Sequence, residues 1–142
     1  MSAKQRVITI VTGLREDVES IREVERLLID QRTHLSAADA DPLESVNGKI
    51  LRITSSLQDN SETRTKALES FGLSANEEGL EALCGKLPEK MKSEILDNYR
   101  NLEESLVRCK AVNDRNGELL VSQKALTDSF FGQDSKLYGE IG

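Results

Sequence analysis

The segment "VITIVTGLREDVESIREVERLL" (residues 7–28) carries the clearest structural signal in the chain. Its apolar positions recur at intervals of mostly three and four residues, which places them on one stripe of an α-helix. The stripe consists of Val7, Val11, Leu14, Val18, Ile21, Val24 and Leu28, and Leu35 continues it. We therefore predict a helix of about thirty residues that packs through a single apolar face.

A second long helix is expected to begin at Asp41. We place Asp41 as the N-cap and Pro42 at the first helical position, where its missing N–H does no harm, and Glu44 completes a capping box. The apolar stripe of this helix is Leu43, Val46, Ile50, Ile53, Leu57, Ala67, Leu68 and Phe71. These signals predict a helix that packs against the first one.

This second helix has a weak middle and a clear end. Asn60 and Arg64 interrupt its apolar stripe, and Gly72 is placed as a left-handed C-terminal stop. The tetrapeptide "SANE" (residues 74–77) then reads as a capping box that opens a short helix, which Gly85 closes. We expect this short helix to form a corner between two long helices.

The last long helix is expected to start at Pro88 and to run for about forty residues. The polar segment "VNDRNGELL" (residues 112–120) interrupts it, and its glycine alone costs about 1 kcal/mol in a helix interior. Three glycines and several large apolar side chains follow toward the C-terminus. We predict a bundle domain over residues 1–129 and a flexible tail over residues 130–142.

The composition predicts an all-α fold. The chain has 142 residues, of which 37% are hydrophobic and 31% charged, and it contains 4% aromatic residues, two prolines and no tryptophan. Three helices of thirty to forty residues would be about 45 to 60 Å long, so they must pack side by side. We predict an elongated antiparallel bundle of three long helices, with one short connecting helix and a flexible C-terminal tail.

Charge and composition argue against several classes of partner. The net charge is −6, and no run of basic residues with interleaved aromatics is present, so nucleic acid is not expected as a partner. The N-terminal apolar segment is too short for a signal peptide or a membrane span. We therefore expect a cytoplasmic protein that does not insert into membranes.

Motifs for catalysis, cofactors or metals are not found. Cys84 and Cys109 lie 25 residues apart in a chain with one histidine, a pattern that matches neither a zinc site nor a redox pair, so we expect both side chains to be buried or half-buried. We expect His34 to be an exposed structural histidine. A distant alternative is a histidine phosphotransfer domain, but the lysine and glycine that should follow His34 in that family are missing. We predict a protein that is not an enzyme and needs no cofactor.

Two readings of the polar segment are open from physics alone. The segment can form a helix kink, or Asn113 and Asn116 can form a buried polar layer that fixes the register of the helices, while Gly117 allows another helix to approach closely. The same residues can instead belong to a surface that binds a partner.

A family resemblance favours the second reading. "VNDRNGELLVSQ" (residues 112–123) resembles the Asn-x-x-Asn-Gly-x-Leu-Leu signature of the FlgN family of flagellar export chaperones, and "LYGEIG" (residues 137–142) is similar to the family's tail segment. The resemblance implies a chaperone for the C-terminal amphipathic helices of the two hook–filament junction proteins, hook-associated proteins 1 and 3. It also implies delivery of these clients to the membrane protein of the flagellar type III export gate.

The resemblance assigns roles to residues of this chain. Tyr138 is the candidate for docking to the export gate. A helix-in-groove mode suits the client, and dimerisation of the free chaperone through its groove is left open. The residues expected to bind the client are Val112, Asn113, Asn116, Gly117, Leu119, Leu120, Leu126, Phe130 and Phe131. The alternative function is a cytoplasmic coiled-coil scaffold or adaptor, in which the asparagines only specify helix pairing.

Overall fold

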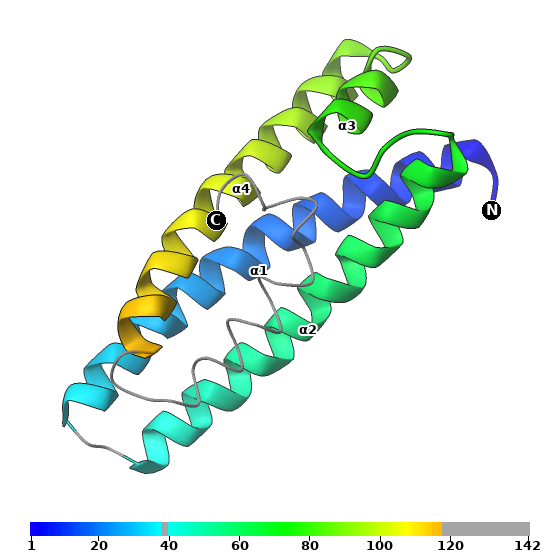
Figure 1. Ribbon diagram of the computed structural model, residues 1–142. Coiled ribbons are helices and arrows are strands. Elements are labelled where there is room, and N and C mark those ends of the chain that lie inside the picture. Colours follow the sequence, from blue (N-terminus) through cyan, green and yellow to red (C-terminus); the bar gives the residue numbers. More distant parts are fainter. Residues whose placement is uncertain (38–39, 118–142) are drawn as a thin grey trace.

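The computed structural model describes residues 1–37 and 40–117 (Figure 1). The described residues form four helices: α1 (Ala3–Ala37), α2 (Ala40–Ser70), α3 (Glu77–Cys84) and α4 (Glu89–Gly117). The all-α class is confirmed, with long helices and one short connecting helix. The predicted domain boundary at residue 129, the tail and the final part of the last long helix lie outside the described residues.

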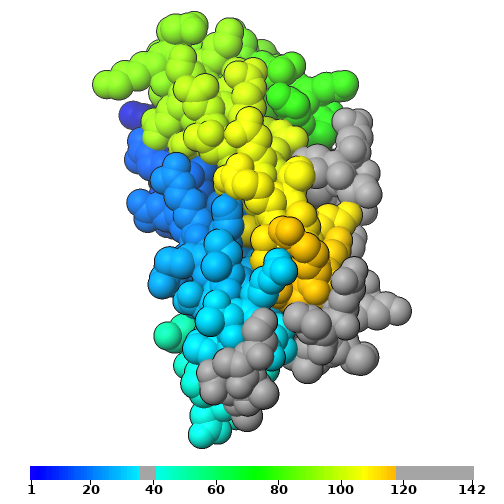
Figure 2. Space-filling view, turned by 90° about the vertical axis from the view of Figure 1, so that its left-hand side faces the viewer, coloured from blue at the N-terminus to red at the C-terminus, as the bar shows by residue number. Residues whose placement is uncertain are grey.

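Helix α1 is the central element of the bundle. It packs along both α2 and α4, whereas α2 and α4 barely contact each other within the described residues. Helix α2 runs antiparallel to α1, and α4 runs in the same direction as α1, from the upper right to the lower left of Figure 1. In the space-filling view the yellow-to-orange surface of α4 lies against the blue surface of α1 (Figure 2).

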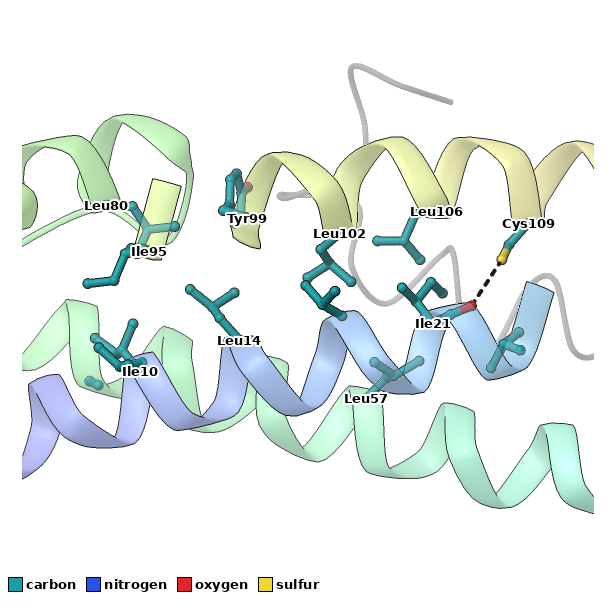
Figure 3. Close-up of a cluster of buried hydrophobic side chains, with 14 of the residues drawn as sticks. Ile10, Leu14, Ile21, Leu57, Leu80, Ile95, Tyr99, Leu102, Leu106 and Cys109 are labelled. Carbon is teal, nitrogen blue, oxygen red and sulfur yellow. Dashed lines mark hydrogen bonds between the residues drawn. The ribbon is translucent and has the colours of Figure 1, made fainter. Parts of the chain in front are cut away.

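The predicted apolar stripe of α1 is confirmed as the spine of the core. Leu14 and Ile21 are fully buried, and Leu102 and Leu106 project from α4 toward α1 (Figure 3). Seven α1 positions in heptad spacing are buried: Ile10, Leu14, Asp17, Ile21, Val24, Leu28 and Gln31. Helix α1 therefore contacts both α2 and α4 through one seam, and two residues of that seam, Asp17 and Gln31, are polar.

Helix α2 begins earlier than predicted and ends as predicted. It starts at Ala40, so Asp41 lies in its first turn and the prediction of Asp41 as the N-cap is wrong. Aspartate is favourable both as an N-cap and within the first turn, where its carboxylate complements the helix dipole. The predicted start of α2 therefore lies close to the observed one. At the other end Gly72 has φ 74°, and Leu73 N–H donates to the Leu68 carbonyl at 3.0 Å. This pattern is a Schellman stop.

The N-cap of α3 also differs from the prediction. Asn76, rather than Ser74, is the cap, and its Oδ1 accepts a hydrogen bond from Gly79 N–H at 2.9 Å. Asn76 is as good a cap as serine, and the capping-box pattern misplaced the start by two residues. A Cβ built on Gly79 would lie 1.7 Å from the Ser74 carbonyl oxygen, so the corner requires glycine there.

Candidate functional site

The polar segment at the end of α4 lies against α1. Asn113 and Asn116 are buried, with 1% and 0% of their surface exposed, while Val112 and Gly117 are half-buried. Asparagine loses its hydration when it is buried, so it must find hydrogen bonds inside the bundle. The structure thus brings these four predicted site residues together.

Asn116 joins a polar layer that crosses three helices. Its Nδ2 donates to the Leu28 backbone carbonyl and to Gln31 Oε1, each at 2.9 Å. Gln31 Nε2 in turn donates to Asn47 Oδ1 on α2. Because these bonds form in one register only, the layer sets how α4 and α2 are placed along α1.

The other predicted site residues fall outside the described part of the chain. These are Leu119, Leu120, Leu126, Phe130, Phe131 and Tyr138. The assignment of client-binding and gate-docking roles to them stays a prediction.

A second polar layer, two heptads earlier in α1, was missed from the sequence. Asp17 Oδ2 accepts from Arg64 NH1 at 2.8 Å, and Asp17 Oδ1 accepts from Asn60 Nδ2 at 2.9 Å. Asn60 and Arg64, the two residues that interrupt the apolar stripe of α2, therefore bind Asp17 of α1. The heptad position of Asp17 between Leu14 and Ile21 was the signal that could have revealed them.

The electrostatics of this second layer reflect its burial. Asp17 is 1% exposed and Arg64 is 3% exposed. Burial raises the pKa of the Asp17 carboxyl, and the charge of Arg64 and its hydrogen bonds lower it only in part. Arg64 Nε and NH2 have no acceptor within the described residues. Such a pair contributes more to the uniqueness of helix pairing than to net stability.

Exposed ion pairs reinforce the pairing of α1 with α4. Arg15 binds Glu94 through two hydrogen bonds, one of them at 3.0 Å, and Arg108 Nε donates to Glu25 at 2.9 Å. The Arg15 side chain lowers the pKa of Glu94. Exposed pairs of this kind contribute roughly 0.2 to 1 kcal/mol each, so they adjust the register that the buried layers define.

Comparison with known proteins decides the family. The family model described as FlgN protein matches residues 1–131. The chain belongs to the FlgN family. The match includes the "VNDRNGELLVSQ" motif (residues 112–123), whereas "LYGEIG" (residues 137–142) lies beyond its end.

A crystal structure supports the fold of this FlgN-family chain. It is described as a flagella synthesis protein, FlgN, from Pseudomonas aeruginosa, and it matches with a TM-score of 0.80 at 24% identity over 87% of this chain and 94% of that chain. No curated protein matches the sequence. Membership of the FlgN family makes the chain a flagellar chaperone in general terms, in a family of chaperones and not of enzymes.

The two cysteines of this FlgN-family chain are core residues, as predicted. Cys84 and Cys109 are free thiols with 0% exposure. Cys109 Sγ lies 3.8 Å from the Ile21 carbonyl oxygen, toward which it points (Figure 3). Burial raises the pKa of the Cys109 thiol to about 12. An uncharged thiol of this kind packs as a small apolar side chain.

The single histidine of the chain lies near the end of α1. His34 lies in the last turn of α1 and is half-buried, so the expectation of an exposed histidine is wrong. None of the helices described for residues 1–37 and 40–117 is long and apolar enough to cross a membrane.

Proposed function

We propose that this FlgN-family chaperone binds the C-terminal amphipathic helices of hook-associated proteins 1 and 3 in the bacterial cytoplasm and delivers them to the flagellar export gate. The arrangement of the long helices carries the proposal. Both α2 and α4 pack along α1, but they barely contact each other within the described residues. A three-helix arrangement in which two of the helices make little contact within the described residues can accept an amphipathic client helix in the helix-in-groove mode.

The client surface is proposed to begin at the end of α4. Val112 is only partly buried and packs against the edge of the core, while Asn113 and Asn116 are inside it. In this proposal the two asparagines hold α4 in register and the apolar residues contact the client. Those residues are Val112, Leu119, Leu120, Leu126, Phe130 and Phe131, with Gly117 allowing close approach.

Calorimetric titration of the full chain with C-terminal peptides of hook-associated proteins 1 and 3 tests the proposal. We expect saturable binding with a negative heat-capacity change, because apolar surface is removed from water. The variant Leu119→Ala/Leu120→Ala should weaken binding at least tenfold. Leu51→Ala is the matched control, since Leu51 is 56% exposed on α2, and it should bind as the wild type does.

The outcomes separate two functions. Unchanged affinity of the Leu119→Ala/Leu120→Ala variant, with its helical circular dichroism intact, would place the client elsewhere. No binding of either peptide to the full chain would reject the chaperone proposal. The scaffold or adaptor function would then be favoured by the Asn116 layer, whose bonds specify helix pairing.

Gate docking is proposed for Tyr138, because a tyrosine buries a large ring at low entropic cost and offers a hydroxyl for pairing. Tyr138→Ala should keep client affinity and reduce affinity for the cytoplasmic domain of the export gate protein, both measured by calorimetry. Tyr138→Phe separates the ring from the hydroxyl. Loss of both affinities, or of neither, would contradict this division of roles.

A further inference from the structure

Two hollows lie along the same seam between α1 and α2. The first, of about 440 Å³, is lined by Glu16, Glu19, Ser20, Ser56, Asp59 and Asn60. The second, of about 350 Å³, is lined by Met1, Arg6, Thr9, Thr63, Lys66, Ala67 and Ser70. Apart from Met1, the described lining residues belong to α1 and α2, and none of them belongs to α4.

The charges of the two hollows are segregated. Arg6 and Lys66 line the second hollow, and none of its lining residues within 1–37 and 40–117 is a carboxylate. Among the same described residues, the first hollow is lined by three carboxylates and by no cation. Because no described carboxylate faces these two cations, the second hollow is electrostatically suited to an anionic group of a partner.

The two cations of the second hollow are not neutralised inside the described structure. Neither Arg6 nor Lys66 forms an ion pair with a carboxylate of residues 1–37 and 40–117. The Arg6 guanidinium lies 6.0 Å from the centre of the Phe71 ring, which holds it in place without using its N–H donors. The hollow therefore offers positioned donors next to the apolar Ala67.

Gly13 lies between the two hollows on α1. A Cβ built there would meet nothing within 4 Å, so packing inside the chain does not require glycine at this position. Glycine in a helix interior costs about 1 kcal/mol relative to alanine. A glycine at position 13 would, however, let the backbone of a partner approach α1 closely.

We propose that the α1–α2 seam docks a helix of a protein partner, with an acidic group of that helix against Arg6 and Lys66 and a basic group against Glu16, Glu19 and Asp59. Glu16 follows Arg6 by ten residues, which is about 15 Å along a helix. The partner helix must therefore present opposite charges about three turns apart on one face, with small or apolar residues between them.

The probe is a synthetic alanine-rich helical peptide with one glutamate and one arginine ten residues apart and leucines between them. Titration into the full ¹⁵N-labelled chain should shift the amide resonances of Thr9, Gly13 and Thr63. Replacing the peptide's glutamate with lysine should weaken binding at least tenfold. Arg6→Glu/Lys66→Glu should reverse this preference, so that the lysine peptide binds better than the glutamate peptide.

Two control variants keep the test sharp. Arg22→Glu/Lys90→Glu makes the same change of net charge at exposed positions outside both hollows and should leave the preference unchanged. Gly13→Leu should block the peptide, whereas Gly13→Ala should retain the fold with a higher melting temperature. Equal affinity of wild type for both peptides, or undiminished binding by Gly13→Leu, would overturn the proposal.

Sedimentation of the chain alone distinguishes a second copy from a partner. If the wild type self-associates and Arg6→Glu/Lys66→Glu does not, the seam binds another copy of this chain and the proposal of a partner helix is overturned. A monomeric wild type that binds the glutamate peptide supports it. The proposal does not depend on client binding at α4, so failure of the hook-associated peptides to bind leaves it standing.

Discussion

Asn116 and Gln31 are 85 residues apart in the chain, and the Nδ2 of Asn116 donates a hydrogen bond of 2.9 Å to Oε1 of Gln31. This bond joins the C-terminal end of α4 to the C-terminal end of α1. It accounts for one helix-weakening residue of the polar segment, because Asn116 is used where the helices meet. The family motif therefore includes at least one residue whose contacts are internal to the bundle.

Replacing Asn116 by alanine should destabilise the protein. The Leu28 carbonyl and Gln31 would lose their donor in a buried place, which costs roughly 1 to 3 kcal/mol. Urea unfolding followed by circular dichroism measures the change. Asp114→Ala, an exposed substitution in the same turn, is the control and should stay within about 0.5 kcal/mol of wild type. Equal effects of the two substitutions would show that the layer does not stabilise the fold.

The Asp17–Arg64 pair should be costly to break and inexpensive to replace. Arg64→Met leaves a buried carboxylate without its cation, which costs about 3 to 5 kcal/mol. The double variant Asp17→Leu/Arg64→Met removes both charges and should recover most of that loss. Both free energies of unfolding come from urea titrations. A double variant no more stable than Arg64→Met alone would mean that shape, and not the unpaired charge, causes the loss.

Gly79 and Gly48 should respond to alanine in opposite directions. At Gly79 the added methyl would lie 1.7 Å from the Ser74 carbonyl oxygen, so the corner must move and the melting temperature should fall by several degrees. At Gly48, inside α2, the nearest atom is 3.5 Å away on the flexible side chain of Arg52. Gly48→Ala should therefore stabilise by about 0.5 to 1 kcal/mol. Thermal unfolding of the two variants checks both signs.

The Cys109 thiol should make stability depend on alkaline pH. Its pKa is raised to about 12 in the folded state, mainly by burial, against an ordinary value of 9.0. The unfolded state therefore loses its proton first as the pH rises. The stability that the protonated thiol contributes is fully present below pH 9 and is lost as the pH rises toward 12. The loss reaches about 2 kcal/mol at pH 10.5.

Urea unfolding of wild type and Cys109→Ala at pH 8 and pH 10.5 isolates this effect, because the alanine variant lacks the titrating group. The difference in stability between the two proteins should shrink at the higher pH. A thiol reagent should also modify Cys109 only as fast as the protein unfolds. Rapid modification in the native state, or a pH-independent difference, would contradict the buried thiol.

Local patterns predicted the helices well. The three-and-four spacing that starts at Val7 is a property of neighbouring residues, and it gave the spine of the core correctly. Gly72 was also predicted correctly, because a left-handed stop needs only the absence of a Cβ. The caps of α2 and α3 were misplaced by one or two residues, since several neighbouring side chains can accept the same backbone N–H groups.

The polar residues show where local reasoning ends. Asn60 and Arg64 read only as gaps in a stripe until α1 supplied Asp17 as their partner. Asn116 was open to two readings until Leu28 and Gln31 were placed beside it. Periodicity reports which face of a helix is apolar, but it carries no information on which helix will cover that face.

By itself the sequence determined an all-α chain, the approximate ends of its helices and its membership of a chaperone family, because helix periodicity, caps and short motifs act within a few residues. The tertiary structure decided that α1 is the central helix, that α4 runs parallel to it, and that Asp17 and Gln31 anchor two polar layers. The bonds Asp17–Asn60 and Gln31–Asn116 join residues 43 and 85 positions apart, and only the folded chain brings their hydrogen-bonding groups within reach.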